Sequence, residues 1–246
     1  MKRIKIVGLC LVAVFAFTAV AAGSAFASGR PEYKVCSKTP KVGNAYPTGE
    51  FSNKECTDAA GGGKYRLESV KGTFTSKSKA ATFTADGKVI VCKKDSDSGE
   101  ITSQFTSTEK ITFTDCYVNG VKKDGECGNV ATSTIETEPL EGQLFFTNEG
   151  ETENGVGLLN EESGIFASFK CGAETITIEG GVLGSIKNSS KGEVITFAVN
   201  GSGEQATKGV WFHGSMILEL SLTAGGKEAT MATIDEQGPK DVGAFS

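Results

Sequence analysis

Short runs of alternating apolar and polar residues fill the chain from residue 64 onward. Val, Ile and Phe recur at one set of alternate positions and Thr at the other, while Gly, Asn, Asp and Ser separate the runs. This period of two predicts half-buried β-strands bounded by turns. Strands are expected at 64–70, 72–76, 80–85, 87–93, 100–106, 109–116, 130–137, 142–147, 155–160, 164–170, 174–179, 182–187, 193–200, 209–213, 215–223 and 228–235.

The fold class follows from this succession of strands. No segment after residue 27 keeps apolar residues at helical spacing over three turns. The pattern therefore predicts an all-β fold, an antiparallel β-sandwich or β-barrel with sequentially paired strands. Asp86-Gly87, Asn154-Gly155 and Gly225-Gly226 tolerate the positive φ angles of tight turns, so we expect hairpins at these points.

The first part of the chain has a different composition. Residues 1–27 combine basic Lys2, Arg3 and Lys5, an apolar run and a small-residue site, which predicts a signal peptide cleaved after Ala27. The length of the apolar run leaves an uncleaved membrane anchor as the alternative. No later run is long enough to span a bilayer, so the mature chain is expected to be secreted or to lie at the cell surface without a transmembrane segment.

Two further regions follow the signal peptide. Residues 28–63 hold three of the five prolines, few apolar residues and a triglycine, which predicts an irregular N-terminal segment tied by Cys36 and Cys56. Residues 64–246 are expected to form a single antiparallel β domain, because strand spacing is continuous across them.

The charge balance argues against one class of partner. The formal net charge of −5 becomes −8 when the three positive charges of the signal peptide are removed. An acidic chain without a basic cluster does not suit nucleic acid, whose phosphates are held mainly by Lys and Arg.

Six cysteines remain after Cys10 is lost with the signal peptide, and an even number in an exported chain predicts disulfides. Cys36 is expected to pair with Cys56 by proximity. Cys116 is expected to pair with Cys127, because the strand pattern stops at Cys116 and Asp124-Gly125 can turn the chain before Cys127. Cys92 then pairs with Cys171 by elimination. The absence of a C-x2-C pair and the single histidine argue against a metal centre, and no cofactor is expected.

Few residues suggest chemistry. Trp211 and His213 would share one face of a strand and could contact a sugar, although the alternative is a strand end with Trp211 in the core. Residues 95–100 resemble the start of a calcium loop, but a plain hairpin turn is favoured. The glutamates of 148–155, with Glu161 and Glu162, could supply the carboxylate pair of a glycosidase, whereas a solvated hairpin tip is the simpler interpretation.

Several landmarks also suggest a family. ECTDAAGGGKYRL, KVIVCKK, ITFTDC followed by GEC, ETEPLEGQLFF, GVGLLNEESGIFASFKCG and ETITIEGGVLGSI fall within about residues 55–200. Together they resemble a group of exported β-rich proteins of high-GC Gram-positive soil bacteria. The resemblance implies export and a shared β scaffold, and it brings no known activity.

The sequence thus favours a noncatalytic protein, secreted or associated with the cell envelope. We expect a surface-binding or structural β module, with cell-wall or extracellular polysaccharide as the candidate partner. One alternative is a secreted glycan hydrolase that uses a carboxylate pair. Another is a protein-binding or protease-inhibitor module that presents a disulfide-closed loop as a rigid ligand.

Overall fold

The computed structural model describes residues 29–121, 126–129, 132–189, 192–212, 215–234, 236–237 and 242–245. All regular elements in these ranges are β-strands, and every strand pairing is antiparallel. The prediction of an all-β antiparallel fold is therefore confirmed. A search of the same ranges for a helix capable of crossing a bilayer found none.

The strands are numbered in chain order. They are β1 (Glu32–Lys38), β2 (Tyr65–Ser69), β3 (Gly72–Ser78), β4 (Ala80–Ala85), β5 (Lys88–Ile101), β6 (Thr106–Val118), β7 (Ile135–Glu136), β8 (Leu140–Phe146), β9 (Asn154–Leu159), β10 (Ile165–Cys171), β11 (Glu174–Ser189), β12 (Gly192–Thr196), β13 (Gly209–Phe212), β14 (Ser215–Glu219), β15 (Leu222–Ala224), β16 (Lys227–Ile234), β17 (Glu236–Gln237) and β18 (Val242–Phe245).

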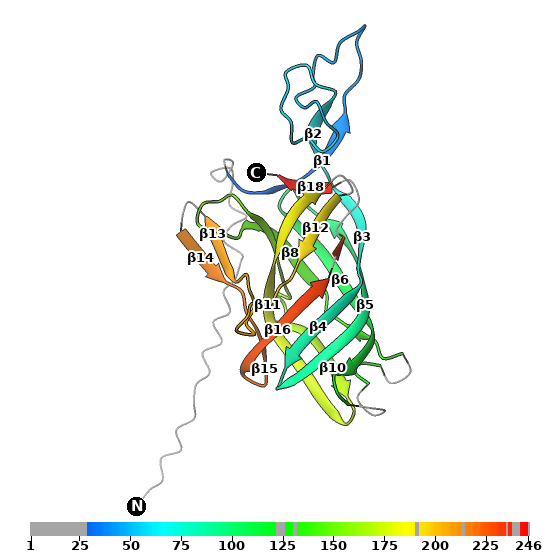
Figure 1. The fold of residues 1–246 in the computed structure, drawn as a ribbon, viewed down its shortest axis with the longest axis vertical. Coiled ribbons are helices and arrows are strands. Elements are labelled where there is room, and N and C mark those ends of the chain that lie inside the picture. The colour runs from blue at the N-terminus through cyan, green and yellow to red at the C-terminus, as the bar shows by residue number, and fades with distance from the viewer. Residues whose placement is uncertain are drawn as a thin grey trace, which may run out of the picture.

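The large sheet closes on itself through two circuits of pairing (Figure 1). One circuit runs β5, β6, β8, β9, β11, β12, β17, β3 and back to β5. The other runs β5, β4, β16, β15, β11, β10, β7, β6 and back to β5, with a bridge from Thr137 to Ala167 linking the β7 and β10 regions. Because the long strands β5, β6 and β11 pass through both circuits, the sheet forms one continuous barrel.

The core fills the inside of this closed sheet. Alternate residues of the strands point inward, as the period of two requires. Phe83 and Phe113 meet there edge to face with ring centroids 4.8 Å apart, and Phe166 and Ile178 are fully buried. This packing explains why Val, Ile and Phe dominate one set of alternate positions in the sequence.

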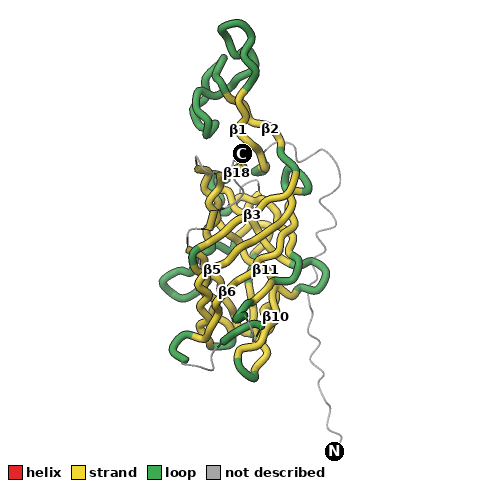
Figure 2. The backbone as a smooth tube through the Cα atoms, turned by 90° about the vertical axis from the view of Figure 1, so that its right-hand side faces the viewer, coloured by secondary structure: helices red, strands yellow, loops and turns green. Residues whose placement is uncertain are grey.

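A small second sheet, ordered β18, β1, β2, lies beyond one end of the barrel (Figure 2). The expectation of an irregular segment at residues 28–63 is wrong in part, because Glu32–Lys38 forms β1 and pairs with both β2 and β18. Pro31 and the prolines after Lys38 break the alternation around β1, which hides a short strand from a pattern search.

The N-terminal residues contact the end of the barrel directly. The Tyr33 hydroxyl lies 3.3 Å from the Ser107 hydroxyl, and both residues are buried. The Arg30 guanidinium donates to the Leu144 carbonyl at 3.2 Å and sits 4.9 Å from the centre of the Phe105 ring. These contacts attach the small sheet to the barrel.

Several predicted strand boundaries differ from the structure: for example, the strand expected at 215–223 is divided into β14 and β15. The expected strands at 87–93 and 100–106 are replaced by one strand, β5, which runs straight through residues 95–100, so neither the hairpin turn nor the calcium loop exists there. Likewise 174–179 and 182–187 form the single strand β11, bent at Gly180, whose φ is 96°. Asn154-Gly155 lies inside β9 instead of at a turn, whereas Asp86-Gly87 and Gly225-Gly226 do form turns.

The disulfide scheme is confirmed for one pair and wrong for two. Cys36 and Cys56 are bonded as expected. Cys116 bonds Cys92 and not Cys127, because continuous pairing of β5 with β6 makes Cys92 and Cys116 direct neighbours. Cys127 bonds Cys171, since a β-bridge brings their backbones together. The predicted Cys116 to Cys127 loop and the Cys92 to Cys171 bond are therefore absent.

Candidate functional site

An open depression of about 720 Å³ lies on the surface of β3, β5 and β6. Exposed hydroxyl side chains from all three strands line it, together with Glu100, Lys110 and Pro139. The hydroxyl-bearing residues are Thr73, Thr75, Ser98 and Thr108. These residues occupy outward-facing alternate positions of their strands. The pairing of β3 with β5 and of β5 with β6 brings them together on one face of the sheet.

Gly99 of β5 lines the depression between the outward-facing Ser98 and Glu100. A Cβ atom at this position would lie 2.1 Å from the Thr108 carbonyl oxygen and 2.9 Å from the Glu109 Cβ. Only glycine therefore fits here. Because Gly99 has no side chain, the depression also reaches the inward-facing residues Phe74 and Glu109.

Three carboxyl groups lie inside the barrel behind this surface. Asp95 and Asp97 are each 5% exposed and Glu109 is 8% exposed. The Ser76 hydroxyl donates to Asp97 Oδ2 at 2.5 Å, and the backbone N–H of Ser78 donates to Asp95 Oδ1 at 3.0 Å. The hydroxyl of Ser78 donates to the other oxygen of Asp95.

The interior raises the pKa of both aspartates. Burial is the main cause for Asp95 and Asp97, because the charged form loses its hydration. The hydrogen bonds from Ser76 and Ser78 act in the opposite direction, as does a hydrogen bond between Asp97 and Glu109. These groups face the packed interior, so we assign them a structural role.

A second carboxyl pair adjoins the depression. Glu141 is the cross-strand neighbour of Thr108, and its side chain forms a hydrogen bond with Glu161 in the turn after β9. Partial burial raises the pKa of Glu161, and the bond to Glu141 and its negative charge raise it further. Glu161 was one of the candidate acids, but its partner Glu141 was not, because sequence cannot place residues on neighbouring strands.

The other acidic candidates lie elsewhere. The stretch that contains Glu149, Glu151 and Glu153 forms the loop between β8 and β9, with Glu149 and Glu153 exposed. This confirms the interpretation as a hairpin tip. Glu162 is exposed in the turn after β9.

The aromatic candidate is not at the depression. Trp211 is partly buried on β13, where it pairs with Phe146 of β8 and Met216 of β14. His213 lies outside the described residues, so its proximity to Trp211 stays a prediction. Trp211 and the depression are on different parts of the sheet, separated by β8.

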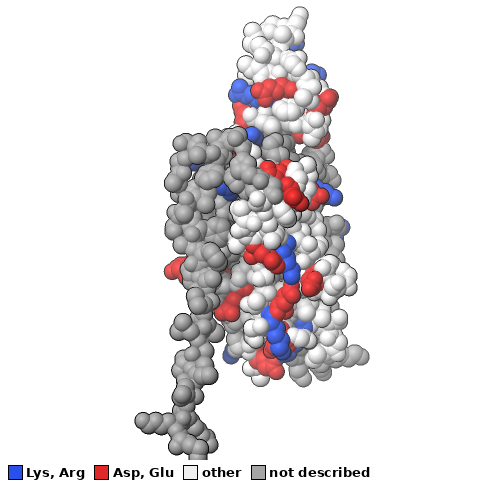
Figure 3. Space-filling view, turned by 90° about the vertical axis from the view of Figure 1, so that its left-hand side faces the viewer, with Lys and Arg blue, Asp and Glu red and all other residues white. Residues whose placement is uncertain are grey.

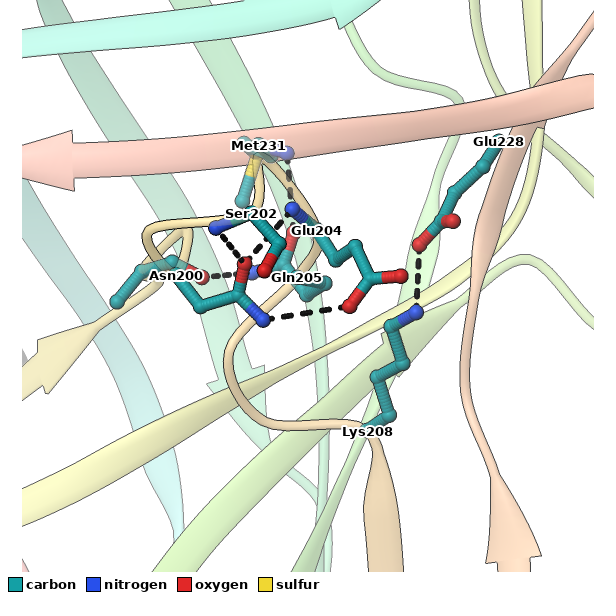
Figure 4. A network of polar contacts seen from close by, with 8 residues as sticks. Asn200, Ser202, Glu204, Gln205, Lys208, Glu228 and Met231 are labelled. Carbon is teal, nitrogen blue, oxygen red and sulfur yellow. Dashed lines mark hydrogen bonds and ion pairs between the residues drawn. The ribbon is translucent and has the colours of Figure 1, made fainter.

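The loop between β12 and β13 is occupied by structural contacts (Figure 4). The Asn200 carboxamide oxygen accepts from the backbone N–H groups of Ser202 and Glu204 at 2.9 and 3.0 Å. Gln205 accepts from the Met231 backbone at 3.1 Å, and Lys208 pairs with Glu228 at 2.5 Å. The ion pair raises the pKa of Lys208. These polar groups stabilise the loop against β16.

Charge on one broad face of the molecule is mixed. Figure 3 shows acidic and basic side chains interspersed along this face, without an extended basic patch. A search of the described ranges for three or more acidic, histidine or cysteine side chains that could hold a metal ion found no such group.

The geometry defines a disulfide-bonded, closed antiparallel β protein with a hydroxyl-lined surface depression. Comparison of the chain with protein-family models, with curated proteins and with solved structures found no match. The resemblance to exported proteins of soil bacteria stays a prediction.

Proposed function

We propose that this protein is a secreted or envelope-associated binding module that holds a polysaccharide in the depression on β3, β5 and β6. The observation that carries the proposal is the group of hydroxyl side chains that three adjacent strands contribute to the depression. Hydroxyls can donate and accept hydrogen bonds, as the hydroxyls of a sugar do. An open depression suits a polymer chain that passes across it.

Export has separate support. Three disulfides are typical of an oxidising, extracellular type of environment, because cytosolic thiols are kept reduced. Together with the predicted signal peptide at residues 1–27, they support a ligand outside the cell.

The close contact between Glu141 and Glu161 argues against this pair as the two catalytic acids of a glycosidase. The two carboxyl groups of a glycosidase stand roughly 5 to 9.5 Å apart, with the scissile bond between them. Glu141 and Glu161 are hydrogen-bonded to each other and leave no such space. The inhibitor alternative loses its motivation, since Cys116 and Cys127 do not close a loop.

A pull-down of residues 28–246 with isolated bacterial cell walls and a panel of extracellular polysaccharides tests the proposal. We expect retention on at least one polysaccharide and no released sugar. Release of sugar by the pure protein would establish a hydrolase instead.

The double variant Thr75→Val/Thr108→Val tests whether the depression is the polysaccharide-binding site. It removes two hydroxyls with little change in shape, and at about 0.5–1.5 kcal/mol for each hydrogen bond the affinity should fall about tenfold. Thr112→Val/Thr114→Val is the control, because these residues lie on β6 outside the depression. Equal affinity of the two variants would exclude the depression as the binding site.

A further inference from the structure

The carboxylates around the depression lie in one row across four strands. Thr73 of β3 is opposite Glu100 of β5, Glu100 is opposite Thr108 of β6, and Thr108 is opposite Glu141 of β8. All four side chains are exposed. Since neighbouring strands are about 4.8 Å apart, Glu100 and Glu141 stand on the two sides of Thr108 with backbones roughly 10 Å apart.

Glu161 adds a third carboxyl group at one end of this row through its hydrogen bond with Glu141. Glu161 and Glu141 share a proton in this hydrogen bond, so the pair contributes one negative charge. Glu100 and Glu141 form no ion pair within the described part of the chain, where the ion pairs involve other acidic groups. The row therefore presents negative charge beside hydroxyl groups.

The basic residue that lines the depression does not offset this charge. The Lys110 ammonium is 2.5 Å from a carboxylate oxygen of Glu136, which lies on β7 away from the row. An anionic polymer would meet Glu100 and Glu141, while the lysine that lines the depression is already paired with Glu136. A ligand with ammonium groups would meet complementary charge.

We propose that the depression selects glycans that carry free amino groups, of the de-N-acetylated amino-sugar type, over neutral and anionic glycans. This inference rests on the proposed function. The hydroxyls of Thr73, Thr75, Ser98 and Thr108 bind the sugar hydroxyls, and Glu100 with the Glu141–Glu161 pair binds the ammonium groups. Charge-assisted hydrogen bonds from ammonium to carboxylate provide the preference.

Isothermal titration of residues 28–246 with three soluble oligosaccharides of equal length tests the inference. The probes are a fully N-acetylated chito-oligosaccharide, its de-N-acetylated form and an oligogalacturonate. An exposed ion pair contributes about 0.2–1 kcal/mol, so two of them should favour the de-N-acetylated form about fivefold over the acetylated form at low salt. The preference should shrink in about 0.5 M salt, which screens exposed charges.

The variant Glu100→Gln/Glu141→Gln tests whether the preference for the de-N-acetylated probe arises from these carboxylates. It keeps shape and hydrogen-bonding capacity, and each removed charge should weaken binding of the de-N-acetylated probe about twofold to fivefold with little effect on the acetylated probe. Glu179→Gln is the control for a lost surface charge, because Glu179 is exposed on β11 away from the depression. A preference that survives in the double variant would overturn the assignment to this row.

The remaining outcomes separate the two proposals. Equal affinity for the acetylated and de-N-acetylated probes would overturn the charge selectivity and leave glycan binding intact. If the protein binds none of the three probes and no polysaccharide in the pull-down, both proposals fail.

Discussion

Asp95 and Asp97 show how single residues of this protein depend on their partners. Their side chains face the inside of the barrel, while Ser96 between them and Ser98 after them are exposed. Ser76 and Ser78 of β3 supply the hydrogen bonds that make burial of the two carboxyl groups tolerable. Burial nevertheless outweighs these hydrogen bonds and raises both pKa values above the ordinary value of 3.8.

The raised pKa values predict a pH-dependent stability. The folded protein binds these protons more tightly than the unfolded chain, so the contribution to stability is full below pH 3.8 and is lost as pH rises through the folded pKa values. Asp97→Asn removes one such charge and keeps an acceptor for Ser76. We expect this variant to be more stable than the parent at pH 7 by on the order of 1 kcal/mol, with the gain shrinking toward pH 4.

Urea unfolding at several pH values measures this difference. Glu149→Gln is the control, because Glu149 is exposed in a loop and its replacement should not change the pH dependence. A gain in stability that is the same at every pH would show that folding does not shift the pKa of Asp97.

The same residues show why the sequence did not predict a continuous strand at β5. A run of Asp, Ser and Gly is typical of turns, so residues 95–99 were expected to end a strand. What keeps them in β5 is the pairing with β3 and β6 on both sides, which involves residues far away in sequence. The composition of residues 95–99 gives no information about these distant partner strands.

At the scale of elements, the long hairpin of β5 and β6 determines the covalent connections. Its register sets Cys92 opposite Cys116, and the chain beyond β6 then places Cys127 beside Cys171 at the end of β10. One disulfide joins neighbouring strands of a hairpin, and the other joins segments 44 residues apart.

Peptide mapping under nonreducing conditions is expected to yield one peptide pair with Cys92 and Cys116 and another with Cys127 and Cys171. Replacing Cys127 and Cys171 by Ala should lower the free energy of unfolding by about 3–4 kcal/mol, because a long loop is released in the unfolded chain. The Cys92→Ala/Cys116→Ala variant releases a shorter loop, since these cysteines are 24 residues apart, and its free energy of unfolding should fall slightly less. A peptide that joins Cys116 to Cys127 would contradict this connectivity.

At the scale of the whole molecule, the class of fold was predictable and its closure was not. Alternation along each strand is a local signal, and it predicted an all-β antiparallel protein. Closure depends on pairings such as β12 with β17 and β17 with β3, which are short and join distant segments. The depression has the same origin, since threonines on separate strands form a site only when the strand order is known.

Removal of β18 would show whether the stability of the barrel depends on the small sheet. Truncation after residue 241 removes β18 and leaves β1 paired only with β2. Because a two-stranded ribbon is marginally stable, amides of Glu32–Val35 should exchange with solvent faster, while those of β5 and β6 should keep their protection. Hydrogen exchange read by mass spectrometry measures both. Equal loss of protection in β5 and β6 would show that β18 stabilises the barrel as well.

The pairing of β1 with β18 also has a consequence for the order of events in the cell. β1 is the first strand of the described chain and β18 is the last, so the small sheet stays incomplete until the C-terminal residues have been synthesised. In a chain that crosses a membrane N-terminus first, β1 would wait on the outside while β18 was still inside. The small sheet would then form only after β18 had also crossed, and until that point β1 would remain accessible to extracellular proteases.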